Sequence, residues 1–356
     1  MLLRSCVISR RTVRNGTRGS ATGMLAACIV VACASLVLSG SARGEVRDVR
    51  FARNLGLGYL QLYVMEELRL VEKHAASDGL GAVKASYTPL GSPAAVNDAL
   101  LSGSVDFGAA GVPPFIIAWD KTRKSSIQIK ALSALNAQPA FLNTINPAIR
   151  TLGDFSETDR IALPAVKSSL QAILLQMAAE QLYGPGQQGR FDHLTVSLSH
   201  PDGTTALLSG RSEITAHFTS PPFQYQELHD PRVRRVLSSY DITGGPASFS
   251  ALWTTTPFHQ ANPRTVLAVL AAVEEATAFI ANNRAEATRI FIKLDNSKLA
   301  ADFVESLLAD PDITYSVVPQ NFLKFSDFMA RIGTIGAKPA TWQDMFFPEL
   351  HGRPGS

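Results

Sequence analysis

The chain has 356 residues, of which 46% are hydrophobic and 18% are charged. This length suits two ordinary domains, and the composition predicts a packed core and excludes a disordered chain. The formal net charge of +3 is unevenly distributed, because residues 1–44 hold six arginines and no acidic residue. Beyond them, 27 of the 33 basic residues remain against 30 acidic ones, a net charge of −3, which argues against a nucleic-acid-binding protein.

Residues 1–44 have the features of a secretory signal peptide. Arginines precede an apolar run at residues 24–38, and small residues follow it. An apolar run of 15 residues is shorter than the roughly 20 needed for a membrane span, so cleavage near residues 42–44 is expected. An uncleaved anchor is the alternative, and the pair Arg10-Arg11 leaves a twin-arginine export route open. No later stretch is expected to cross a membrane.

From residue 45 onward, short strands alternate with amphipathic helices. Ser92 and Pro93 form a typical N-cap and first-turn pair, and Gly103 is a typical helix stop. Strands are predicted in this first block at residues 49–53, 84–88, 105–110 and 127–135. Helices are predicted between them at residues 59–74, 92–103 and 115–119.

A second block repeats the alternation and is followed by a helical C-terminal third. Strands are predicted at residues 161–163, 194–198, 213–218 and 248–255. Helices are predicted at residues 170–183, 204–208 and 262–282, and after Pro222. The remainder to residue 347 is expected to be helical with short breaks and to add no strand. Repeated strand–turn–helix units imply a mostly parallel sheet and the α/β class.

Five turns lie after a predicted strand and at the start of a helix. In an open α/β sheet such turns gather at the carboxyl edge of the strands, where ligands bind. Free N–H groups at helix N-termini suit an anionic group there, although simple helix capping would explain each turn alone. The turns are Gly58-Tyr59, Gly91-Ser92-Pro93, Gly111-Val112-Pro113, Ser168-Ser169 and Ser220-Pro221-Pro222.

The patterns of known enzyme sites are missing from the sequence. All three cysteines lie in residues 1–44, and the seven histidines show no helical metal-ligand spacing. A nucleophile elbow and a P-loop are also absent. His217 is the only histidine expected near a crevice, with a satisfied, partly buried imidazole as the alternative. Trp253 is expected either in the core or at a ligand or hinge contact.

Several segments resemble one family of proteins. These are Gly58-Tyr59, residues 91–100, residues 103–108 and residues 111–114, with weaker likenesses at residues 151–155, 167–169 and 339–347. In this order they resemble the periplasmic substrate-binding proteins of nitrate/sulfonate/taurine-type ABC importers. The resemblance runs over the whole chain after the signal peptide.

The resemblance implies a type II two-lobed periplasmic-binding-protein fold, in which each lobe is a mostly parallel sheet flanked by helices. One lobe would comprise residues 45–136 and 248–356, and the other residues 137–247. The segments 132–140 and 248–255 would form the hinge.

The resemblance also implies a monomeric, non-enzymatic receptor in the periplasm. It would capture a small organic anion and deliver it to a membrane permease with its ATPase, with no cofactor, metal or nucleic acid. Only Arg53 would offer a cation near the turns, so an anion would rest mainly on helix N-termini and hydroxyls. The ligand-binding residues implied by position are Gly58, Tyr59, Gly91, Ser92, Gly111, Val112, Ser168, Ser169, Thr219 and Ser220.

Two other functions stay open at this point. One is an enzyme on the same fold, of the pyrimidine-precursor synthase or desulfinase type. The other is a ligand sensor that signals to a membrane kinase.

Overall fold

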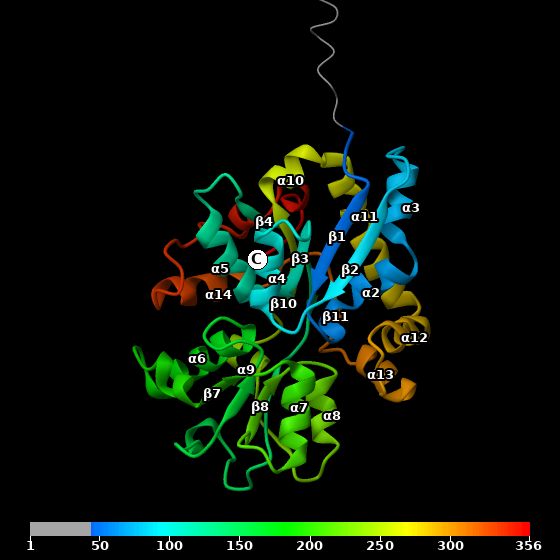
Figure 1. Ribbon diagram of the computed structural model, residues 1–356. Coiled ribbons are helices and arrows are strands. Elements are labelled where there is room, and N and C mark those ends of the chain that lie inside the picture. Colours follow the sequence, from blue (N-terminus) through cyan, green and yellow to red (C-terminus); the bar gives the residue numbers. More distant parts are fainter. Residues whose placement is uncertain (1–43) are drawn as a thin grey trace, which may run out of the picture. The chain divides into compact units, whose positions relative to one another are not determined.

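The computed structural model describes residues 44–356, in which Glu45–Ser356 form one compact unit. Apart from Gly44, the predicted signal peptide lies outside the described residues. The described chain forms two β-sheets with helices packed around each of them (Figure 1). The α/β class predicted from the sequence is confirmed.

The first sheet has six strands. They are β1 (Asp48–Arg53), β2 (Lys84–Pro89), β3 (Phe107–Gly111), β4 (Ile129–Ala137), β10 (Ser248–Thr255) and β11 (Thr314–Tyr315). Their order is β11-β4-β10-β3-β1-β2. Strands β1 to β4 run in one direction, and only β10 and β11 are antiparallel to their neighbours. Four of the six strands therefore share one direction, as predicted, whereas β10 at the centre and β11 at the edge make the sheet mixed.

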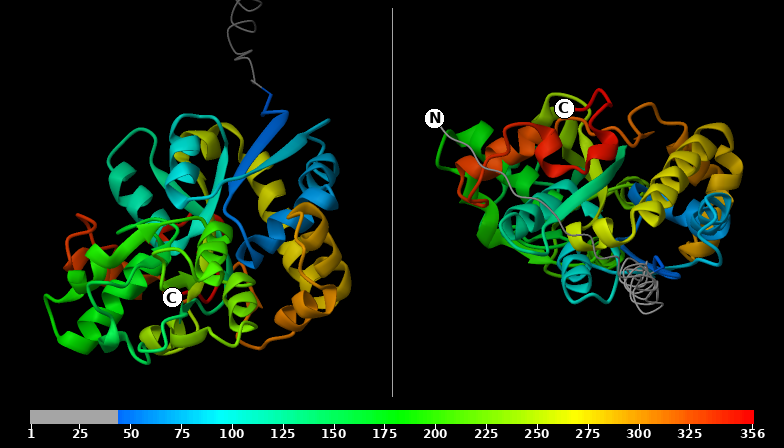
Figure 2. Two further views of the ribbon diagram at one scale, coloured as in Figure 1. Left: turned by 60° about the horizontal axis from the view of Figure 1, so that its bottom comes forward. Right: turned by 90° about the horizontal axis from the view of Figure 1, so that it is seen from above.

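Two groups of helices cover the first sheet, one on each side (Figure 2). One group comprises α2 (Leu60–Glu67), α3 (Leu70–Ser77), α11 (Pro263–Asn282), α12 (Arg284–Leu294) and α13 (Ala301–Leu308). The other comprises α4 (Pro93–Leu101), α5 (Val112–Thr122) and α14 (Phe322–Arg331). Short elements complete this part: α10 (Thr256–Ala261), β11 and the 3-10 turns η1 (Leu57–Tyr59), η4 (Trp342–Met345) and η5 (Pro348–Leu350).

The core of this part is aromatic. Trp253 on β10 is fully buried, and its ring lies 5.5 Å from that of Phe115 on α5. Phe322 and Phe346 pack edge-on against the same Phe115 ring. Of the two roles considered for Trp253, the structure supports the core role.

Helix α11 corrects one prediction. By length and composition it could cross a membrane, although no stretch after the signal peptide was expected to do so. Half of its apolar window is buried within the protein. It packs against α2 and α3 and buries Val266, Val269 and Val273, so it serves here as a core helix of the first sheet.

The second sheet has five strands in the order β7-β6-β8-β5-β9. They are β5 (Phe141–Thr144), β6 (Ile161–Leu163), β7 (Thr195–Ser197), β8 (Ala216–Thr219) and β9 (Arg234–Ser238). Only β5 runs against the other four. The helices around it are α6 (Leu170–Tyr183), α7 (His200–Ser209), α8 (Phe223–Leu228) and α9 (Ser239–Thr243), with the 3-10 turns η2 (Leu152–Asp154) and η3 (Gln188–Leu194).

The structure differs from the predicted elements at several places. Strands β5 and β9 were not predicted, and β11 adds a strand to the C-terminal third, where none was expected. The helix predicted at residues 59–74 is two helices, because Arg69 takes a left-handed conformation with φ of 50°. The short strand β11 forms only by pairing with Asn136 and Ala137 of β4, a contact that local sequence does not encode.

Candidate ligand-binding cleft

The carboxyl ends of strands from both sheets enclose a small cavity. Strands β1, β3 and β6 each end in a turn that leads to a helix beside it, as expected for an open α/β sheet. The enclosed space has a volume of about 20 Å³, enough for about one water molecule. Its walls are Asn54, Leu55, Tyr59, Gly91, Pro93, Gly111 and Phe249 from segments of the first sheet and Pro164, Leu170, Gln171 and His200 from those of the second.

Close backbone approach brings the turns of the two sheets into contact. The Leu57 amide donates a hydrogen bond of 3.1 Å to the Pro221 carbonyl. At Gly56, whose φ is +103°, a Cβ would lie 2.9 Å from that same carbonyl oxygen. A Cβ at Gly111 would lie 3.1 Å from Leu170 Cβ. Glycine is needed here because any side chain would push the two sets of turns apart.

The ten residues predicted for the site fall into three groups. Tyr59, Gly91 and Gly111 line the cavity. Ser92 and Ser169 cap helices: the Ser92 hydroxyl accepts from the Ala95 amide at 3.3 Å and the Ser169 hydroxyl from the Ala172 amide at 3.2 Å. These two serines hold the N-termini of α4 and α6 in place beside the cavity.

The other five predicted residues lie behind the cavity or beside it. Gly58 has its carbonyl bonded to the Ser250 hydroxyl at 2.8 Å, and Val112 is buried at the start of α5. Ser168 lines a separate cavity of about 170 Å³ between α4 and α5. Thr219 donates to or accepts from His200 at 2.8 Å, and Ser220 is buried at the end of β8.

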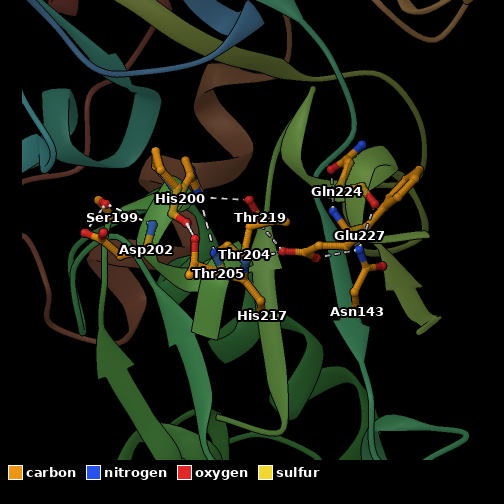
Figure 3. Close-up of polar contacts among 12 residues, drawn as sticks. Asn143, Ser199, His200, Asp202, Thr204, Thr205, His217, Thr219, Gln224 and Glu227 are labelled. Carbon is orange, nitrogen blue, oxygen red and sulfur yellow. Dashed lines mark hydrogen bonds and ion pairs between the residues drawn. The ribbon is translucent and has the colours of Figure 1, made fainter. Parts of the chain in front are cut away.

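A buried chain of polar side chains runs from the cavity wall into the core of the second sheet (Figure 3). His200 lines the cavity, and its Nδ1 lies 2.8 Å from the Thr219 hydroxyl and 3.5 Å from His217 Nε2. His217 Nδ1 in turn lies 2.6 Å from an Oε1 oxygen of Glu227. Both His217 and Glu227 are fully buried.

Glu227 is the inner end of this chain. Its carboxylate accepts hydrogen bonds from the Asn143 amide at 2.9 Å, the Thr204 hydroxyl at 2.9 Å and His217 Nδ1 at 2.6 Å. Three donors on two oxygens satisfy the hydrogen-bonding capacity of this buried carboxyl group. Among the described residues, no ion pair joins a lysine or arginine to Glu227 or to either histidine.

The sequence pointed to the wrong histidine of this pair. His217, expected near the crevice, lies behind His200, which forms part of the cavity wall. The missed signal is the segment Ser199-His200-Pro201, in which an N-cap serine is followed by a proline in the first helical turn, one position later than in Ser92-Pro93. The helix here was predicted to begin at residue 204, whereas α7 begins at His200.

The cavity wall contains no lysine, arginine, aspartate or glutamate. Among its eleven residues only His200 can titrate near neutral pH. Burial, and the neighbouring imidazole of His217, hold the pKa of His200 well below its usual range. Positive charge at the cavity comes from the N-termini of α4, α5, α6 and α7, which begin at Pro93, Val112, Leu170 and His200.

Arg53, the cation expected near the turns, points elsewhere. Its guanidinium lies 3.5 Å above the ring of Tyr63 and 3.5 Å from Glu66, and the side chain is buried. Arg53 therefore does not contribute a charge to the cavity. Within the part of the chain that the structure describes, no cluster of three His, Cys, Asp or Glu residues could hold a metal ion.

No protein-family model and no curated protein sequence matches the chain. Solved structures do match it. The alkanesulfonate-binding protein SsuA from Xanthomonas axonopodis pv. citri, bound to MOPS, superposes with a TM-score of 0.67 at 17% identity, covering 84% of this chain and 98% of that one. The periplasmic aliphatic sulphonate-binding protein SsuA from Escherichia coli gives 0.63 at 19% identity, covering 85% and 98%.

The periplasmic nitrate-binding protein NrtA from Synechocystis PCC 6803 is also similar, with a TM-score of 0.65 at 14% identity over 85% of this chain and 84% of that one. At such low identity these likenesses establish the fold. The chain has the two-lobed fold of periplasmic binding proteins, as the resemblance in its sequence implied.

Proposed function

We propose that residues 45–356 form the solute-binding component of an ABC importer, which captures a small organic anion of the sulfonate, taurine or nitrate kind. The observation that carries this proposal is the cavity built from strand ends and helix N-termini of both sheets. The structural neighbours that bind alkanesulfonates and nitrate support the ligand class.

In this proposal the lobes are residues 45–136 with 248–356 and residues 137–247. The strand membership of the two sheets supports this division, because β5 to β9 all belong to the second sheet. The proposed hinge is made of residues 132–140 and 248–255. These segments lie side by side where the chain passes between the sheets, with Ala137 paired to Ser248.

The ligand-binding residues are proposed to be the ten implied by position, with those on the cavity wall in direct contact. A cavity of about 20 Å³ is smaller than a sulfonate, so capture requires the two sets of turns to separate and close again. The helix N-termini would then supply N–H donors to the anion from both sides.

The proposal also covers location and partners. We expect export to the periplasm with cleavage near residues 42–44, a monomeric protein, and delivery to a membrane permease with its ATPase. An enzyme of the same fold and a sensor for a membrane kinase remain the alternatives. Turnover of a bound ligand would favour the first, and a neighbouring sensor-kinase gene the second.

Thermal unfolding with a panel of anions tests the proposed function. Residues 45–356 should be stabilised by a taurine, alkanesulfonate, nitrate or carboxylate ligand, by about 2.7 kcal/mol when its concentration is a hundred times the Kd. If no anion of the panel raises the midpoint of unfolding, the proposal is wrong.

A pair of tryptophan variants locates the site. Gly91→Trp should abolish the ligand-induced stabilisation, because Gly91 lines the cavity and a Cβ there would lie 3.6 Å from Ser199 Cβ. Gly352→Trp is the matched control, since a Cβ at Gly352 would meet nothing within 4 Å. Full stabilisation of the Gly91 variant would place the ligand elsewhere.

A further inference from the structure

The cavity wall lacks the fixed positive charge that would balance an anion. None of its residues is lysine or arginine, and Arg53 is turned toward Tyr63. Behind the wall lies the carboxylate of Glu227, which is fully buried and bonded to neutral donors and to His217. An anion in the cavity would therefore face a second negative charge across the imidazoles of His200 and His217, and like charges repel more strongly in a low-dielectric interior than in water.

We propose that capture of the anion is coupled to the uptake of one proton by the chain His200–His217–Glu227, and that His200 contacts the anion. This inference rests on the proposed function and adds the residue that supplies the missing charge. The proton comes from solvent and stays on the two imidazoles while the anion is bound.

The geometry of the chain shows how one proton changes the cavity wall. Glu227 accepts from His217 Nδ1, so with both imidazoles neutral His217 Nε2 is an acceptor that faces His200 Nδ1. With its proton on Nδ1, His200 donates to the Thr219 hydroxyl at 2.8 Å, and its Nε2, which lies 3.5 Å from the Gln171 amide nitrogen, is an acceptor. In this state the three side chains carry only the charge of Glu227, and His200 Nε2 presents a lone pair to an anion.

One added proton changes both the net charge of the three side chains and the acceptor role of His200 Nε2. His200 or His217 becomes an imidazolium, so Nε2 of His200 becomes a donor and the chain becomes neutral overall. Burial and His217 disfavour this proton in the absence of an anion, because they lower the pKa of His200. An anion against the ring raises that pKa again, and by linkage the proton strengthens anion binding by the same factor.

The other groups around His200 leave this account intact. On its own helix α7, Asp202 accepts from the Ser199 hydroxyl at 2.5 Å. The neutral Gln171 on α6 lies 3.5 Å from His200 Nε2. The ring of Phe223 on α8 stacks on the His200 ring, with centroids 5.6 Å apart. Thus His217 is the titratable group that the ring of His200 meets from the neighbouring elements of the described residues, and Glu227 lies behind His217.

Titration calorimetry with ethanesulfonate and nitrate tests the proposal, because both are fully ionised and any proton taken up belongs to the protein. Amine buffers of different ionisation enthalpy, bis-tris and imidazole, avoid competing sulfonates. We expect about one proton taken up per anion at pH 7, and a Kd that rises with pH by as much as tenfold per pH unit. Binding without net proton uptake, or with a Kd that does not change with pH, would overturn the proposal and leave the proposed function standing.

Variants distinguish proton uptake by His200 and His217 from proton uptake by other titratable groups. His217→Gln should bring proton uptake close to zero, and His200→Gln should weaken binding at least tenfold and remove its pH dependence. His193→Gln is the matched control, because His193 pairs with Glu157 on the surface at 2.9 Å and should behave as wild type. Unchanged pH dependence in both chain variants would refute the assignment.

Failure of both anions to bind the wild-type protein between pH 5.5 and 8 would overturn the proposed function and this inference together. The wild-type proton count is interpretable even if a variant does not fold. The two proposals can therefore fail separately.

Discussion

At Gly203 the backbone of α7 lies directly against the ring of His217. A Cβ at this position would lie 2.5 Å from His217 Nε2, and the ring cannot yield freely because Glu227 holds its other nitrogen. Alanine normally stabilises a helix relative to glycine, but here overpacking should dominate. We expect Gly203→Ala to lower the free energy of unfolding by roughly 1–3 kcal/mol, measured by urea denaturation.

The control for this substitution is Gly189→Ala. Its Cβ would lie at an ordinary 3.6 Å from Asp192 Oδ2, so the unfolding midpoint should hardly move. Equal midpoints for the two variants would mean that the His217 ring is not fixed as described.

Helix α6 contributes its N-terminus to the cavity, and of the two adjacent serines before it only Ser169 caps the helix. Ser169 accepts from the Ala172 amide, whereas the half-buried Ser168 donates only to the Val166 carbonyl. Ser169→Ala should cost about 1 kcal/mol of stability, and Ser168→Ala less than about 0.5 kcal/mol. A chemical-denaturation series compares them, and a larger loss at Ser168 would contradict the assigned cap.

At the scale of the whole molecule, the sequence predicts the class of the fold and the turns that meet at the cavity. Local patterns suffice there, because Ser92 and Ser169 cap their helices, Gly91 follows β2 and Gly111 ends β3. The polar chain beneath the cavity was missed because its members come from different elements. Only the packing of α7 and α8 on β8 brings His200, His217 and Glu227 together, and no spacing in the sequence records it.

Local sequence also could not predict the direction in which the Arg53 side chain points. Arg53 ends β1 beside the predicted turn, yet the aromatic ring of Tyr63 and the carboxylate of Glu66 draw its guanidinium away from the cavity. Cation–π contact and pairing with a carboxylate stabilise a buried arginine. Both partners, Tyr63 and Glu66, lie on α2, the helix that follows β1 in the chain.

Capture of an anion requires the two sides of the cleft to part and then to close on it. A disulfide across the cleft tests this claim most directly, because residues 45–356 contain no cysteine. The double variant Gly91→Cys/Ser199→Cys would place two Cβ atoms about 3.6 Å apart, within the range of a disulfide. Calorimetry should find that the oxidised protein does not bind the anion that stabilises wild type most, and that reduction restores binding. Equal affinity in the oxidised and reduced forms would contradict the account.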